Sequence, residues 1–168
     1  MQSISKKDNY FIGTLSGTSM DAIDASIYKI TNKIKLVDSI SHKMPKDLKA
    51  KLFSLSKSKK NLFKNPTKAL KQADDEFTKI TVKTIKRLIK KSGLSSSDIT
   101  AIGSHGQTIQ HSPFSKKPYS LQIGSPDLIA IQTGITTIGN FRQTNIMNGG
   151  SGAPLLSLIH ISEPTRPC

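Results

Sequence analysis

The stretch "FIGTLSGTSMDAIDASIYKI", from Phe11 to Ile30, places a short polar turn between two runs of largely apolar residues. The second run alternates apolar and polar side chains with an imperfect period of two, which is typical of a half-buried strand. We therefore predict strands over Tyr10–Leu15 and Ala22–Ile30, followed by a third over Ile34–Ile40. Three short strands joined by tight turns form an antiparallel meander.

The remaining segments predict helices and further strands in an order typical of an α/β fold. A short helix is expected from Lys46 to about Ser56, and a longer one that Asn65 caps, with Pro66 in its first turn and Gly93 at its end. The later elements are strands at 99–103, 119–123 and 135–141 and a helix at 125–133 that ends at Gly134. This order predicts a mixed sheet flanked by helices.

Composition limits the classes of protein to which the chain can belong. Its 168 residues suit one domain, and its net charge of +14 is compatible with a nucleic-acid partner. We regard nucleic-acid binding as a weaker alternative because only Arg87, Arg142 and Arg166 are arginines among the 25 basic residues. No apolar run approaches the roughly 18 residues of a membrane span. The one cysteine is Cys168, and the N-terminus has no apolar core of a signal peptide, so we expect a cytoplasmic setting without a membrane partner.

The polar turn Ser16–Asp21 has the composition of a phosphate-binding turn. Backbone N–H groups beside Gly17 can approach phosphate oxygens closely because glycine has no side chain. Asp21 and Asp24 could hold a magnesium ion near those oxygens. The turn lacks the P-loop signature. An ordinary hairpin turn rich in glycine and hydroxyl residues explains the same letters, and this alternative stays open.

Two later segments carry polar side chains that suit a ligand. In "GSHGQT", His105, Gln107 and Thr108 could bind a polyhydroxylated substrate, and His105 could also carry a proton. A histidine held structurally by backbone carbonyls is the alternative. Arg142 follows the last predicted strand, where an arginine could clamp a carboxylate or phosphate. Its alternative is an ordinary surface ion pair.

A glycine-dense loop, Asn148–Pro154, follows this arginine. Such a loop allows a ligand to approach the backbone closely, or it serves as a hinge.

Together these segments resemble the anhydro-N-acetylmuramic acid kinases. The family's "SGTSLDG(V/M)D" is matched by 16–24, its "AIGSHGQT" by 101–108, its "QIG(D/N)P" by 122–126, and its "DFRRRD…GGQGAPL" by 141–155. The resemblance covers about Tyr10 to Leu155 with the four motifs in register. It implies an actin- and hexokinase-like fold, with a ribonuclease-H-like lobe over 10–155.

The resemblance also implies an activity and a set of site residues. The family uses ATP and Mg²⁺, opens the 1,6-anhydro ring of its small-molecule sugar substrate with water, and phosphorylates O6, which recycles cell-wall sugar. The implied ATP-binding residues are Gly17, Thr18, Ser19, Met20, Asp21, Ala22, Ile23 and Asp24, with Asp21 and Asp24 near the metal. The resemblance implies that Thr108 and Arg142 contact the sugar, and we expect His105, Gln107 and Asn145 to contribute to the same substrate site. No catalytic residue is expected in this chain, because the family's general base belongs to a second lobe.

The chain also departs from the family. The family's Arg-Arg-Arg-Asp is Arg142-Gln143-Thr144-Asn145 here, and 156–168 resembles nothing in the family. We expect a disordered N-terminus at 1–9, an atypical tail from truncation or artefact at 156–168, and a fragment inactive without the second lobe. A full-length member could pair as a homodimer. The alternative from another class is a non-catalytic module that binds a nucleotide or an amino sugar.

Overall fold

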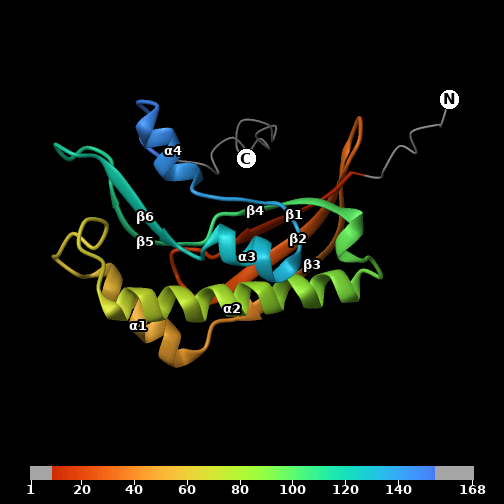
Figure 1. Cartoon of the computed structure of the whole chain (residues 1–168), viewed down its shortest axis with the longest axis horizontal. Helices are drawn as coiled ribbons and strands as arrows, with labels where there is room; N and C mark the ends of the chain where they lie inside the picture. Colours follow the sequence, from red (N-terminus) through yellow and green to blue (C-terminus); the bar gives the residue numbers. More distant parts are fainter. Residues whose placement is uncertain (1–8, 154–168) are drawn as a thin grey trace, which may run out of the picture.

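The computed structural model of the chain describes residues 9–153, and a five-stranded sheet in the order β3-β2-β1-β4-β7 lies at its centre (Figure 1). Strands β1, β2 and β3 form the expected antiparallel meander, and β4 and β7 continue the sheet in parallel. The strands are β1 Tyr10–Leu15, β2 Ala22–Ile30, β3 Ile34–Lys43, β4 Ile99–Ser104 and β7 Thr137–Ile138. The α/β fold with a mixed sheet is therefore confirmed, and it is compatible with an actin- and hexokinase-like lobe.

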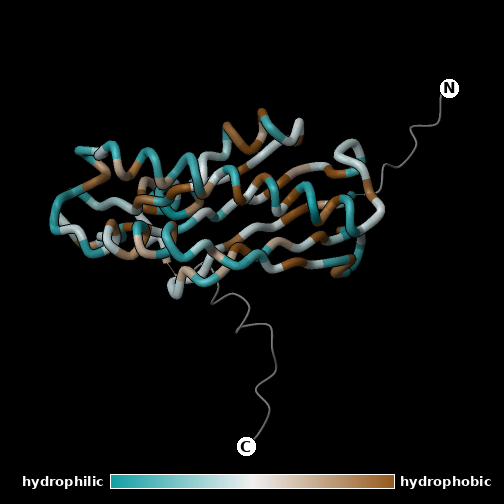
Figure 2. The backbone as a smooth tube through the Cα atoms, turned by 90° about the horizontal axis from the view of Figure 1, so that it is seen from below, coloured by the Kyte–Doolittle hydropathy of each residue, from teal (hydrophilic) through white to brown (hydrophobic). Residues whose placement is uncertain are grey.

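Helices α1 (Lys46–Ser56) and α2 (Lys68–Lys91) run along one side of the sheet, and α4 (Phe141–Met147) lies on the other (Figure 1). The C-terminal half of α2 packs on β1, β2 and β4, because alternate residues of these strands turn apolar side chains toward it. The packing of α2 on these strands forms a first core, which consists of Ile12, Ala25, Ile27, Val82, Ile85, Leu88, Ile89, Ile99, Ile102, Ile129 and Ile135. Figure 2 shows how hydrophobic and hydrophilic stretches alternate along the chain.

A second core joins α1 and the N-terminal half of α2 to a hairpin of β5 (Gln107–Ser112) and β6 (Tyr119–Ile123). Phe77 lies at its centre and is 1% exposed. Met20, from the turn between β1 and β2, and Ile23, from β2, also pack in this core. Strand β5 is not predicted from the sequence because Ile109 is the only apolar residue within it. The two cores therefore meet through α2 and β2.

The N-terminal cap of helix α2 lies two residues later than predicted. Thr67 occupies the cap position, and its hydroxyl accepts a hydrogen bond from the Leu70 N–H at 3.2 Å, so the prediction that Asn65 caps the helix is wrong. A helix of 24 residues follows and ends just before Gly93, as expected. The η1 turn (Ser96–Asp98), which carries its own capping box, then leads into β4.

The cap can be tested by removing the Thr67 hydroxyl and the Asn65 side-chain amide in two separate variants. Thr67→Ala should lower the free energy of unfolding by about 1 kcal/mol, within a range of roughly 0.5–2, because one helix N–H loses its acceptor. The urea midpoint measures this loss. Asn65→Ala is the matched control and should leave the midpoint nearly unchanged, since Asn65 is exposed and precedes the helix. Equal effects of the two substitutions would contradict the assignment.

The last predicted strand, Ile135–Phe141, is also shorter than expected. Only Thr137–Ile138 pair with β4, and α4 starts at Phe141. The strand ends where Asn140 takes a left-handed conformation with φ 58°, directly after Gly139, which packs so closely on Pro126 that a Cβ there would overlap the proline ring. Helix α3 (Pro126–Thr133), capped by Ser125 and ended by Gly134 as predicted, supplies that proline. Arg142 consequently lies in the first turn of a helix rather than at a strand end.

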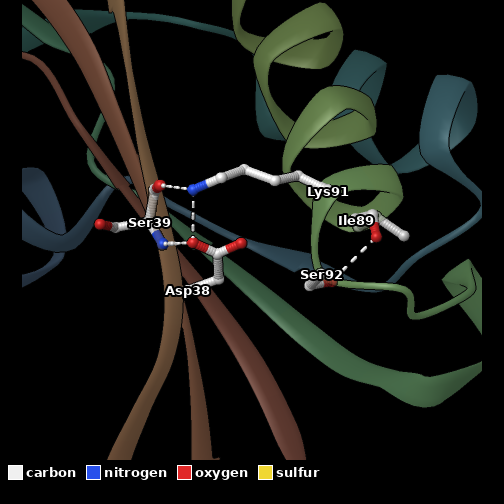
Figure 3. A network of polar contacts seen from close by, with 5 residues as sticks. All are labelled: Asp38, Ser39, Ile89, Lys91 and Ser92. Atoms are coloured by element: carbon white, nitrogen blue, oxygen red, sulfur yellow. Dashed lines mark hydrogen bonds and ion pairs between the residues drawn. The ribbon is translucent and has the colours of Figure 1, made fainter.

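A polar contact fastens the edge strand β3 to the end of α2 (Figure 3). The Lys91 ammonium donates to an Asp38 carboxylate oxygen at 2.6 Å and to the Ser39 carbonyl at 3.0 Å. The same carboxylate accepts the Ser39 N–H at 2.7 Å, and these bonds lower the pKa of Asp38. The group is exposed, so its net contribution to stability is small.

Among residues 9–153, no helix has the length and apolar character that crossing a membrane requires. The predicted disordered start, except for Asn9, and the atypical tail at 156–168 both lie outside the described residues.

Candidate functional site

A cleft of about 370 Å³ opens on the face of the sheet opposite α2. It lies there because Gly13 and Gly103, on neighbouring strands, leave no side chain between the sheet and α4. The Phe141 ring closes one side, 3.8 Å from where a Cβ of Gly103 would stand. The lining residues are Gly13, Thr14, Leu15, Asp24, Ser26, Tyr28, Gly103, His105, Phe141 and Arg142.

Three of the predicted site residues, Asp24, His105 and Arg142, meet in this cleft. The Arg142 Nε donates to His105 Nε2 at 2.8 Å, and Arg142 Nη1 donates to the Gly152 carbonyl at 2.8 Å. His105 Nδ1 lies 3.1 Å from the Gly106 carbonyl. Arg142 is therefore held by a side chain and a backbone carbonyl, and it makes no ion pair with a carboxylate of residues 9–153.

Burial sets the protonation of this pair. Desolvation is the main cause that lowers the pKa of His105, and the Arg142 charge lowers it further, while the bond to the Gly106 carbonyl opposes the shift. Desolvation also lowers the pKa of the Arg142 guanidinium. The pKa values of His42 and His111 fall for the same main reason, with nearby cations adding to the effect. The His105 imidazole is thus neutral at pH 7 beside a charged guanidinium.

These histidines predict a loss of stability in mild acid. Because their folded pKa values lie below the ordinary 6.5, the unfolded chain binds protons first as the pH falls. The free energy of unfolding should therefore be highest above pH 6.5 and decrease as the pH drops through that value. We expect a lower urea midpoint at about pH 5.5 than at about pH 7.5, and a smaller drop in His42→Gln. A midpoint that stays constant over this range would contradict the assignment.

Two hydrogen bonds hold the turn between β1 and β2, and residues at its tip are exposed. The Ser16 hydroxyl donates to the Ala22 carbonyl at 2.8 Å, and the Met20 N–H donates to the Gly17 carbonyl at 3.0 Å. Met20 takes a left-handed backbone with φ 55°, which turns its side chain into the second core. Residues 17–19 are exposed, and within 9–153 their backbone N–H groups donate to no other group. Three free amides at an exposed turn suit anionic oxygens.

Two carboxylates flank this turn. Asp24 pairs with Leu15 across the hairpin and lines the cleft. Asp21 forms an exposed ion pair with Lys49, and the hydrogen bonds from Lys49 and Ser19 lower its pKa. The described residues hold no group of three or more histidines, cysteines or carboxylates that could bind a metal by themselves. Asp21 contacts α1 through Lys49 and Asp24 lines the cleft, so each offers magnesium one carboxylate, and magnesium commonly takes one or two from the protein and the rest from phosphates and water.

The other predicted site residues lie outside the cleft lining. The side chains of Met20 and Ile23 pack in the second core, so only their backbone can face a nucleotide. Gln107 is also buried, with its amide nitrogen 3.1 Å from the Thr108 carbonyl and its Oε1 without a partner among residues 9–153. The Thr108 hydroxyl accepts from Gln122 at 3.4 Å. Their roles toward a ligand stay predictions.

Asn145 holds the glycine-dense loop. Its Oδ1 accepts the Gly152 N–H at 2.8 Å, and its carbonyl accepts the Gly150 N–H at 2.9 Å. The sequence does not predict that Asn145 holds this loop, and it does not predict Ser26 and Tyr28 in the cleft. The period of two that places Asp24 on the open face could have found both of these residues.

Comparison with known proteins gives one consistent result. A family model described as anhydro-N-acetylmuramic acid kinase matches residues 9–163. Proteins of that name from Mannheimia succiniciproducens and Idiomarina loihiensis are each 39% identical to the chain, over 152 and 154 residues. One from Coxiella burnetii is 39% identical over 150 residues. These matches cover 89–90% of this chain, which spans about 40% of the length of each relative.

Proposed function

The chain belongs to the anhydro-N-acetylmuramic acid kinase family, and from this premise we propose that it supplies the phosphate-binding turn and part of the sugar site of such a kinase. The proposed reaction opens the 1,6-anhydro ring with water and transfers the γ-phosphoryl group of ATP to O6 of the sugar. In keeping with the relatives' greater length, the proposed general base lies outside this chain.

One observation carries the proposal: the backbone amides of 17–19 donate to no group of residues 9–153, and they lie in the segment between Leu15 and Asp24, which both line the cleft together with Arg142. Phosphoryl transfer depends on positioning and on charge near the transferred group more than on covalent help from the protein. The amides of Gly17, Thr18 and Ser19 would bind phosphate oxygens. Arg142 would supply positive charge toward the substrate.

The remaining roles follow the same logic. Asp21 and Asp24 would hold magnesium, which when bound neutralises charge on the phosphate oxygens. Release of Asp21 from Lys49 would accompany binding, because the lysine competes for the same carboxylate. His105, Gln107, Thr108 and Asn145 would shape the sugar side, two of them through the backbone that they hold. A cytoplasmic setting and a homodimer of the full-length protein also belong to this proposal.

The nucleotide turn is tested by adding bulk where the fold has room. A Cβ at Gly17 would meet only the Ser19 hydroxyl, at 4.0 Å, so Gly17→Val should fold normally while covering the amides. We expect calorimetry to show MgATP binding by the chain, weakened at least about tenfold in Gly17→Val. Thr31→Val, in the β2–β3 turn, is the matched control and should bind like the unaltered chain.

Three outcomes separate the candidate functions. Absence of MgATP binding would contradict the proposed turn. Binding of the anhydro sugar alone would instead favour a non-catalytic amino-sugar module. A coupled assay for ADP release should show no turnover by the isolated chain, since the general base is proposed to lie elsewhere; turnover would refute that part of the proposal.

A further inference from the structure

We propose that His105 is a positioning residue, which holds the Arg142 guanidinium in the cleft through one fixed tautomer of its imidazole. The inference rests on the proposed function only where it takes Arg142 to face the substrate. His105 then acts through Arg142, and not as a free proton carrier.

The tautomer follows from the donors. An arginine Nε always carries hydrogen and cannot accept, so the 2.8 Å contact requires a lone pair on His105 Nε2. The imidazole proton must then be on Nδ1, where it donates to the Gly106 carbonyl at 3.1 Å. Both ring nitrogens are used, and the ring can gain a proton only by giving up its bond to Arg142.

The opposite side of the guanidinium is fixed by a second chain of bonds. Arg142 Nη1 donates to the Gly152 carbonyl at 2.8 Å, and the Gly152 N–H donates to Asn145 Oδ1 at 2.8 Å. Gly152 has φ +67°, and a Cβ there would lie 3.0 Å from the Arg142 carbonyl oxygen and from the Ile146 side chain, so the loop packs closely on α4 beside Arg142. Asn145, Gly152 and His105 therefore act together on one side chain.

What remains of Arg142 is suited to an anionic oxygen. A guanidinium has five N–H donors, of which His105 and Gly152 use two. The others donate to no group of residues 9–153, and no carboxylate of these residues forms an ion pair with the guanidinium. A half-buried cation held from two sides can receive a carboxylate or phosphoryl oxygen without reorganising.

Protonation of His105 would dismantle this arrangement. It would remove the acceptor of the Nε–H and place two cations in contact. The titratable groups that face the pair are Asp24 and Tyr28 from β2, while His111 on β5 senses the Arg142 charge. The lining residues of β1 contribute no titratable group. Ligand affinity should therefore fall as the pH drops through the protonation of His105.

The tautomer can be measured directly in the chain labelled with ¹⁵N. Long-range proton–nitrogen spectra at about pH 7.5 should show His105 with a protonated Nδ1 and an unprotonated Nε2. Arg142→Gln should raise the pKa of His105, whereas His42, whose pKa responds to Arg87 and Lys83, is the internal control and should not move. The proposal would be overturned by a proton on His105 Nε2, or by a His105 pKa that stays the same in Arg142→Gln.

A binding measurement separates positioning from simple packing. Calorimetry with the anhydro amino sugar should show affinity falling up to about tenfold per pH unit below the His105 pKa. His105→Gln keeps an acceptor but no titratable ring, so it should weaken sugar binding less than His105→Phe does at about pH 7.5, and its affinity should lose the pH dependence. His105→Phe should bind weakly at every pH.

The outcomes for the two hypotheses differ. If the unaltered chain binds no sugar, the proposed function fails, while the spectra still decide whether His105 positions Arg142. If His105→Gln retains the full pH dependence, or if His105→Phe binds as tightly as the unaltered chain, the positioning role is overturned.

Discussion

Gly106→Ala should be among the most destabilising single substitutions in the chain, with an expected loss of at least about 3 kcal/mol in the free energy of unfolding. Gly106 has φ +68°, a conformation that costs an L-residue roughly 1–2 kcal/mol. An added Cβ would also overlap the carbonyl oxygen of Ile123 on β6. That backbone cannot retreat easily, because β5 and β6 pair from Gln107 and Ile123 onward.

Gly134→Ala is a matched control for this result. Gly134 has φ +72°, nearly the same backbone conformation, but a Cβ there would meet nothing within 4 Å. It should cost only about 1–2 kcal/mol from the conformation alone. Urea unfolding of the two variants measures the difference, which isolates the contact with Ile123. Equal losses at the two glycines would show that the strand pair can separate to admit a methyl group.

The position of Gly106 also bears on the site. Its carbonyl accepts the Ser16 N–H at 3.4 Å, at the base of the phosphate turn, and lies 3.1 Å from His105 Nδ1. One backbone carbonyl thus contacts both the proposed nucleotide and sugar sides. Displacing it should disturb both sides even in the fraction of molecules that remain folded.

The sequence predicts the elements whose signals are local. The bounds of β1, β2, α1 and β6 agree with the prediction because each shows its apolar period or its flanking turn residues without help from distant contacts. Helix α3 is likewise found from Ser125, Pro126 and Gly134. The meander and the α/β class follow from the order of these elements.

Elements that depend on tertiary contacts are not found in this way. Strand β5 is polar in sequence and becomes a strand because its hairpin buries Ile109 against α1 and α2. Strand β7 ends early at the left-handed Asn140, next to the close packing of Gly139 on Pro126, which no local pattern reveals. For the site, motifs indicate His105 and Arg142 separately, but their bond joins residues 37 positions apart. Only the fold brings them together.

Phe77→Ala should cost about 3–5 kcal/mol, because it removes a ring that is 1% exposed at the centre of the second core. The ring packs directly on the backbone of Gly124, where a Cβ would lie 2.9 Å from it. Its neighbour Asp74 accepts the Gly124 N–H at 2.7 Å, so α2 supports the turn after β6 at this point. A loss of this size is a large fraction of the roughly 5–15 kcal/mol that stabilises a typical domain.

Phe114→Ala is the matched control, since Phe114 lies between β5 and β6 and is 91% exposed. It should change the free energy of unfolding by no more than about 0.5 kcal/mol. Because Phe77→Ala could prevent folding, Phe77→Leu provides a graded variant with a smaller expected loss and a folded product for binding studies. Met20 and Ile23 share this core with Phe77, so the leucine variant should also bind MgATP more weakly, whereas Phe114→Ala should not. If Phe77→Leu loses stability but keeps its MgATP affinity, the second core does not anchor the phosphate turn, and the bonds made by Ser16 and Gly17 must be sufficient to hold it.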